Sequence, residues 1–170
     1  MTSSNVASPS SESRTTSGVV ITPEQLLHHW QGHRRLTRRM IEAFPEDKLF
    51  TFSLGSMRTF GALAMEFVRM TVPIARGVAT GKWTSAEPPE PKSKADLLQL
   101  WDAATNEINV LWPTIPTQRF QETDKAFGQW EMPIYSLLLY VIDNEIHHRG
   151  QGYVYLRSLG IEPPPFWERG

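Results

Sequence analysis

The residues best suited to chemistry lie in one short stretch near the end of the chain. Residues 144–151 read Asn-Glu-Ile-His-His-Arg-Gly-Gln, inside an apolar pattern that predicts one helix from about 133 to 159. Because side chains four residues apart share a helix face, Asn144 and His148 project together. Imidazole is a common metal ligand, so this face can present two ligands to one ion. The alternative is a core histidine hydrogen-bonded to Asn144 or to a carboxylate, and spacing alone favours it.

Charged and small residues flank this pair. The carboxylate of Glu145 or Asp143 could hydrogen-bond a metal-ligating side chain and so orient it, although Asp143 is more easily explained as a solvated surface residue. Arg149 could form an ion pair with either carboxylate. Gly150 and Gly152 are unfavourable inside a helix. They therefore predict close approach by another helix, either within the fold or from a dimer mate.

The remaining three histidines lie in a basic run over residues 28–39. His29 and His33 have the i, i+4 spacing of a metal clamp, but the surrounding arginines make the segment a poor place for a cation. We predict that these histidines are exposed, with one turned toward the core. The arginines are predicted to form a solvated face, with weak anion binding as the functional alternative.

Four helical segments must position these side chains. Thr22 and Gln25 predict a capping box at the start of the first, and Ser93 is the predicted N-cap of the third. Pro73 predicts a kink or a break within the second. A short hairpin or an ordered loop is expected around Gly128. The apolar spacing places the four helices at 22–44, 59–79, 93–112 and 133–159.

Four amphipathic helices joined by non-helical connections imply an all-α fold, a four-helix bundle. Residues 1–20 are rich in Ser and Thr and predict a disordered tail. Residues 21–170 are then expected to form the bundle domain.

The composition excludes several classes of protein. The chain of 170 residues has a net charge of −1, which argues against a general nucleic-acid binder. It has no cysteine, which excludes disulfides and thiolate nucleophiles. Because no apolar run approaches the length of a membrane span or of a signal-peptide core, we expect a cytoplasmic protein with no membrane partner.

Three stretches together resemble the DinB family, also called DinB/YfiT-like, over about residues 22–162. They are 57–61 (Met-Arg-Thr-Phe-Gly), the string 143–151, and 153–157 (Tyr-Val-Tyr-Leu-Arg). The resemblance implies an up-down-down-up four-helix bundle that is commonly dimeric, so we expect a homodimer. It also implies a divalent metal, often nickel or zinc, held by three histidines, and some relatives are thiol-dependent transferases or isomerases.

This chain departs from that ligand set. His148 matches one family histidine, whereas Asn144 stands where its partner would be. Glu66 stands where the resemblance places the third, although a shift of one residue would select Met65. One imidazole, one carboxylate and one amide bind zinc or nickel less well than three imidazoles. Three outcomes are open at Glu66, Asn144 and His148: a site for another cation, a weak site, or a metal-free network in which Glu66 raises the pKa of His148.

Two functions follow from this departure. The first is a metal-dependent hydrolase or a thiol-dependent transferase that acts on a small molecule through an altered metal site. The second is a non-catalytic dimer that binds a small molecule or serves in stress, and that has lost the metal. Fold alone does not decide between them, because function belongs to the site.

Overall fold

The computed structural model describes residues 20–170, so nearly all of the predicted N-terminal tail lies outside the described residues. In chain order the described elements are α1 (Pro23–Ala43), α2 (Glu46–Leu49), α3 (Phe60–Thr80), α4 (Lys94–Leu111), the 3-10 helices η1 (Trp112–Thr114) and η2 (Thr117–Gln121), β1 (Thr123–Ala126), β2 (Trp130–Pro133) and α5 (Ile134–Ser158).

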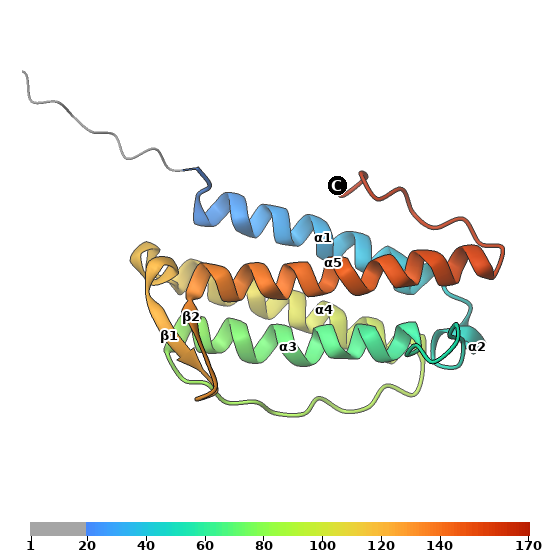
Figure 1. Cartoon of the computed structure of the whole chain (residues 1–170), viewed down its shortest axis with the longest axis horizontal. Coiled ribbons are helices and arrows are strands. Elements are labelled where there is room, and N and C mark those ends of the chain that lie inside the picture. Colours follow the sequence, from blue (N-terminus) through green and yellow to red (C-terminus); the bar gives the residue numbers. More distant parts are fainter. Residues whose placement is uncertain (1–19) are drawn as a thin grey trace, which may run out of the picture.

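The four long helices form the expected bundle (Figure 1). Helices α1 and α5 run in one direction and α3 and α4 in the other, because the connection 81–93 returns along the length of the bundle. Helix α3 packs on α4 and α5, and α1 packs on the same two helices from the other side. This is the up-down-down-up order that the family resemblance implies.

The helix ends follow from the predicted caps. The hydroxyl of Thr22 accepts a hydrogen bond from the backbone of Gln25, and the Gln25 side chain accepts one from Thr22, which completes the capping box. Of the kink or break expected at Pro73, the break is absent, since α3 continues through it as one helix. Proline removes one backbone hydrogen bond, and the Pro73 ring is buried, so the rest of the helix holds the segment together.

Two short elements join the long helices. The hairpin expected around Gly128 is present: β1 and β2 pair antiparallel, and Phe127 and Gly128 adopt left-handed φ angles of 52° and 69° in the turn. The four-residue helix α2 was not predicted, because one turn of helix has no periodicity to detect.

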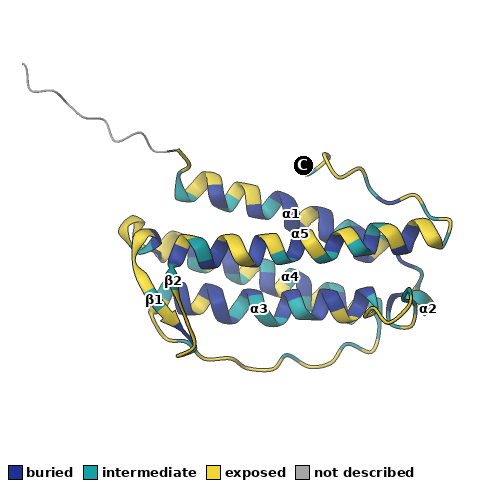
Figure 2. Cartoon of the chain, in the orientation of Figure 1, coloured by how far each residue is buried: buried dark blue, intermediate teal, exposed yellow. Residues whose placement is uncertain are grey.

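The core lies between the long helices, whose inward faces are buried along their full length (Figure 2). Trp30, Trp101 and Trp112 are 0%, 1% and 6% exposed, as their helical spacing predicts. Gly152 confirms the close approach expected of it, since a Cβ there would lie 2.5 Å from the ring of Phe60 on α3. A Cβ at Gly150 would meet open space, so contact with a dimer mate at that position remains a prediction.

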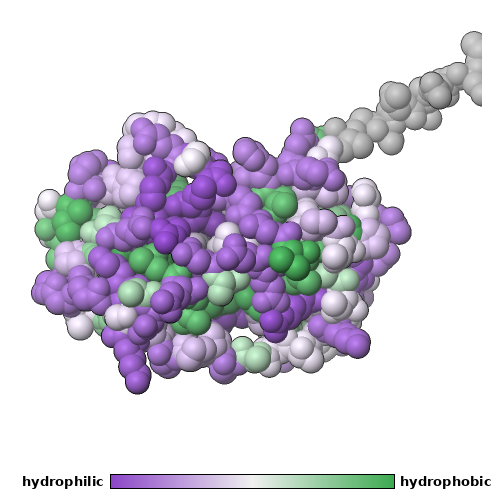
Figure 3. Space-filling model, turned by 180° about the vertical axis from the view of Figure 1, so that it is seen from behind, coloured by the Kyte–Doolittle hydropathy of each residue, from purple (hydrophilic) through white to green (hydrophobic). Residues whose placement is uncertain are grey.

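The face seen from behind is mostly hydrophilic, with scattered hydrophobic patches (Figure 3). In the described part of the chain, none of the helices combines the length and the apolar character needed to cross a membrane.

Candidate functional site

The structure brings Glu66, Asn144 and His148 together between α3 and α5. The Asn144 amide nitrogen donates to Glu66 Oε1 over 3.0 Å, and His148 Nε2 lies 3.5 Å from the same oxygen. The side chains of Glu66 and His148 are 26% and 17% exposed, so the cluster lies at the edge of the bundle and not deep in its interior. Met65, the alternative in the alignment, is buried in the core.

His148 is held in a neutral form. Its ring stacks on Phe67, and its Nδ1 faces the Gln151 side-chain amide at 3.2 Å. Burial lowers the pKa of His148, and although Glu66 opposes this shift, nearby Arg58 adds to it. Glu66 thus acts to raise this pKa, as the metal-free alternative expected, but desolvation outweighs the attraction of the carboxylate and the net shift is downward.

Arg58 and Asn144 complete the polar surroundings of Glu66. Arg58 makes a charge-assisted hydrogen bond to Glu66 Oε2, so one carboxylate oxygen faces a guanidinium and the other faces Asn144. The Asn144 amide nitrogen also contacts the Met70 sulfur at 3.4 Å. The Asn144 oxygen is buried and has no hydrogen-bond partner among residues 20–170.

These residues do not fit a tightly held zinc or nickel ion. The amide presents its nitrogen, not its oxygen, to the carboxylate, and the Arg58 guanidinium already supplies positive charge beside Glu66. No group of three or more His, Cys, Asp or Glu side chains in the described chain is placed to share a metal ion. One imidazole with one carboxylate and one amide is a weaker donor set than three imidazoles.

An apolar pocket of about 560 Å³ lies next to this cluster, in the groove between α3 and α5. Met70 is common to both features, because it lines the pocket and contacts Asn144, whereas the three residues of the cluster are not part of the lining. The hairpin closes the far side with Phe127 and Trp130, and α5 adds Tyr140.

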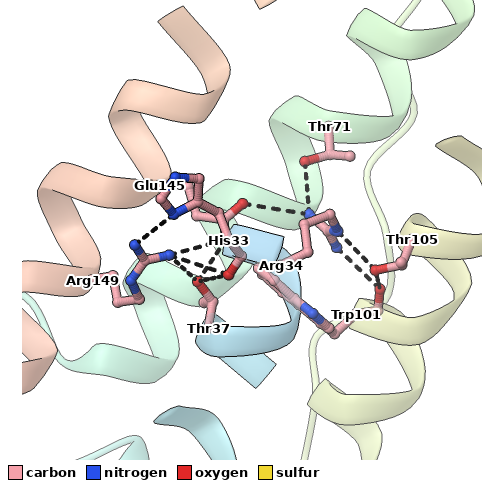
Figure 4. A network of polar contacts seen from close by, with 8 residues as sticks. All are labelled: His33, Arg34, Thr37, Thr71, Trp101, Thr105, Glu145 and Arg149. Atoms are coloured by element: carbon pink, nitrogen blue, oxygen red, sulfur yellow. Dashed lines mark hydrogen bonds and ion pairs between the residues drawn. The ribbon is translucent and has the colours of Figure 1, made fainter. Parts of the chain in front are cut away.

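A second polar cluster lies deeper, on the α1 side of α5 (Figure 4). Glu145 is 1% exposed and accepts a hydrogen bond of 2.5 Å from Thr37. It lies 3.8 Å from Arg34 and 3.7 Å from Arg149, and the structure thus confirms that Arg149 pairs with a flanking carboxylate. Arg149 also donates to the His33 carbonyl oxygen and contacts His33 Nδ1 at 2.9 Å.

Arg34 corrects the prediction that the arginines of residues 28–39 form a solvated face. It is 1% exposed, stacks over Trp101 at 3.9 Å, and donates to the hydroxyls of Thr71 and Thr105. Burial lowers its pKa to about 10, and Glu145 opposes that shift. A buried guanidinium is tolerated here because α3, α4 and α5 all supply it with partners.

His33 is the histidine that turns toward the core, as predicted, while His29 is exposed. Burial and the neighbouring Arg149 lower the pKa of His33 to about 3, so it is neutral over the whole physiological range. Its Nδ1 faces the Arg149 guanidinium at 2.9 Å and its Nε2 faces the Arg169 guanidinium at 3.2 Å, so the neutral ring accepts a hydrogen bond from one of the two. The buried cluster therefore contains two guanidinium groups and one carboxylate, with one positive charge in excess.

Comparisons with known proteins agree with the fold and with the family resemblance of the sequence. The family model described as DinB family matches residues 13–169, nearly the whole chain. The chain belongs to the DinB family.

Particular relatives and solved structures are distant in sequence. The chain is similar to the uncharacterized protein YjoA of Bacillus subtilis, 23% identical over 148 residues, which cover 85% of this chain and 96% of YjoA. It is similar to the uncharacterized protein YrdA of the same organism, 26% identical over 145 residues, which cover 84% of this chain and 86% of YrdA.

The same fold occurs in solved structures. The crystal structure of the DinB-like protein YjoA superposes with a TM-score of 0.71 at 22% identity, over 85% of this chain and 97% of that one. A DinB-like protein from Bacillus cereus superposes with a TM-score of 0.69 at 21% identity, over 84% and 95% of the two chains. At these identities the structures show the fold alone.

Proposed function

We propose that this chain is a small-molecule hydrolase or thiol-dependent transferase whose reaction centre is Glu66, Asn144 and His148. The observation that carries this proposal is the position of the cluster beside the apolar pocket, with Met70 common to both. An apolar pocket with a few convergent polar groups at one end is the usual form of a small-molecule site. Family membership supports the location, since Glu66 and Asn144 stand where the resemblance places metal ligands.

In this proposal a divalent ion, nickel or zinc by family resemblance, binds weakly or not at all. The chemistry then comes from the side chains themselves. Glu66 accepts the proton of an attacking water or thiol, and the Nε2–H of neutral His148 donates to the negative charge that develops on the substrate. Asn144 holds Glu66 Oε1 in place through its 3.0 Å hydrogen bond.

Arg58 has a supporting role in the same scheme. Its contact occupies Glu66 Oε2 and leaves Oε1 directed toward Asn144 and His148. Arg58 side-chain atoms are half exposed, so a substrate with a negative group could also approach the guanidinium.

The test is turnover in chelator-treated buffer. Ester hydrolysis and thiol transfer to a small electrophile are followed for the parent, for Glu66→Gln, and for Glu42→Gln as a matched control. Glu42 is an exposed glutamate that also pairs with an arginine, Arg38. We expect Glu66→Gln to lose about 10²- to 10⁴-fold in rate and Glu42→Gln to keep the parent rate. Activity that appears only with stoichiometric zinc or nickel, or that survives in Glu66→Gln, would contradict the proposal.

A further inference from the structure

The C-terminal segment 161–170 turns back along the bundle and closes a second cavity against α5 (Figure 1). Three side chains hold this segment by its carbonyl oxygens. Tyr153 donates to Pro164 over 2.8 Å, Arg35 donates to Arg169 over 2.9 Å, and Arg39 donates to Glu168. The cavity beneath has a volume of about 370 Å³.

Positive charge dominates the wall that α5 contributes to this cavity. Arg149 and Arg157 line it, and Glu162 is the acidic residue of the lining. Glu162 lies 3.9 Å from Arg157, and both side chains are largely exposed, so solvent screens this pair. Glu145 lies 3.7 Å from Arg149 and 3.8 Å from Arg34, so one carboxylate is shared between two guanidinium groups.

One guanidinium donor of the cavity lining makes no hydrogen bond within the described residues. Arg149 directs Nη1 and Nη2 to His33 and Thr37, while its Nε makes none of the hydrogen bonds found within residues 20–170. The Nε of Arg39 is buried and has no partner in the same described residues, although Arg39 is not part of the cavity lining. An anion in the cavity would offer an acceptor to Arg149, which lines it.

The pKa of the Tyr153 phenol shows that several guanidinium groups lie near one point of the cavity wall. Burial raises the pKa of Tyr153, and the guanidinium groups of Arg149, Arg39, Arg157 and Arg169 all oppose that shift. Four cations from α1, α5 and the C-terminal segment are therefore close enough to act on one phenol.

The other walls of the cavity are apolar. Ile146, Pro163, Phe166 and Trp167 line it, and the last two are 60% and 68% exposed. Guanidinium groups on one side and aromatic groups on the other match a ligand with one anionic and one apolar end. We propose that this cavity binds a small organic anion, a carboxylate or phosphate that carries an aryl or acyl group.

This site is independent of the proposed reaction centre. The Glu66 cluster faces α3, whereas the cavity lies between α5 and the C-terminal segment on the α1 side. Failure of either proposal therefore leaves the other standing.

The test uses the full chain and measures binding of three aryl probes and of inorganic phosphate by the chemical shifts of the backbone and indole N–H groups. The probes are 3-phenylpropionate, its neutral analogue 3-phenylpropionamide, and phenyl phosphate. We expect saturable shifts at residues 146–157 and at the Trp167 indole with the carboxylate, and much weaker shifts with the amide. Phenyl phosphate shows whether the site prefers a phosphate, and inorganic phosphate shows what the anion contributes without an apolar group.

Variants separate the charge from the fold. Arg149→Lys keeps the charge but loses the planar donor set, and it should weaken 3-phenylpropionate binding about tenfold. Arg39→Gln combined with Arg157→Gln alters two side chains that are not fully buried, and it should weaken binding about tenfold even if Arg149→Lys is unstable. Arg76→Gln, an exposed arginine on α3, is the matched control and should bind like the parent.

Three results would overturn the proposal. The first is equal affinity for the carboxylate and the amide, and the second is parent-like binding by the variant that combines Arg39→Gln with Arg157→Gln. The third is no saturable shift at residues 146–157 below about 10 mM probe, a concentration beyond that of ordinary specific binding.

Discussion

Two polar clusters contain adjacent residues of α5, and they differ in burial, in the helix that they face and in their hydrogen-bond partners. Asn144 and His148 face α3, are partly exposed, and lie beside an apolar pocket, and the Asn144 oxygen lacks a partner within residues 20–170. Glu145 and Arg149 face α1, are buried, and are bound by groups from α1. Successive residues of a helix point about 100° apart, so adjacent residues of α5 can face two different helices, α3 and α1.

The difference separates a cluster that links the helices from the cluster that we propose as the reaction centre. The Glu145 cluster joins helices through a guanidinium and a carboxylate whose removal would leave buried charge behind. The Glu66 cluster contributes little to holding the bundle together and keeps unused hydrogen-bonding capacity beside a pocket. Residues that perform chemistry commonly give up stability in this way.

The largest expected effect is on stability, from Glu145→Gln. This change leaves the Arg34 and Arg149 guanidinium groups without a counter-charge, and it should lower the free energy of unfolding by about 3–5 kcal/mol. Glu66→Gln removes a partly exposed carboxylate and should cost no more than about 1 kcal/mol. Urea denaturation of both variants checks this, and equal losses would erase the distinction between the clusters.

The pH dependence of stability should come next in size. Unfolded His33 takes up a proton near pH 6.5, whereas in the fold its pKa is about 3. The unfolded state therefore binds more protons between these values, so His33's contribution is complete above pH 6.5 and falls as the pH drops toward 3. We expect a loss of about 1.4 kcal/mol per pH unit over this range.

Denaturation at pH 7.0, 6.0 and 5.0 measures this slope. His33→Asn should flatten it, and His28→Asn, at an exposed histidine, should not. An unchanged slope in His33→Asn would mean that other groups carry the acid sensitivity.

Removing hydrogen-bonding side chains from the two clusters should separate them further. Thr37→Val takes a partner from both Glu145 and Arg149 and should cost about 1–3 kcal/mol. Asn144→Leu loses one hydrogen bond but also removes a buried oxygen without a partner, so its effect should stay within about 1 kcal/mol. Thermal unfolding compares the stability of the two variants directly. A larger loss of stability in Asn144→Leu would mean that the Glu66 cluster, and not the Glu145 cluster, stabilises the fold.

The smallest effect on stability is expected on the third, outward face of α5. Tyr135 and Leu139 are 42% and 40% exposed there, and we predict that this face contributes to a homodimer. Leu139→Asp should change the free energy of unfolding by less than about 0.5 kcal/mol while shifting sedimentation from dimer to monomer. A parent protein that sediments as a monomer at micromolar concentration would end this prediction.

Much of the fold could be predicted because its causes are local. Apolar spacing and caps such as Thr22 with Gln25 act within a few residues, and they placed the long helices to within two residues. The burial of Arg34 could not be predicted, since its partners Thr71, Thr105 and Glu145 come from three other helices.

The candidate site divides in the same way. The shared face of Asn144 and His148 follows from helical spacing, and the place of Glu66 follows from the family resemblance. Neither the Arg58 contact nor the orientation of the Asn144 amide could be predicted, because both depend on how neighbouring segments pack. Arg58 stands in one of the strings that resemble the family, and that position was the available signal.

The central claim is that Glu66, Asn144 and His148 occupy the three ligand positions of an altered DinB-type metal site. Replacing Glu66→His and Asn144→His in one chain tests it most directly, with zinc and nickel binding measured by calorimetry on tag-free protein. We predict that the double variant folds normally and binds these ions about a hundredfold or more tightly than the parent, since three imidazoles then converge. A folded double variant that binds zinc and nickel no better than the parent would show that these positions do not form such a site.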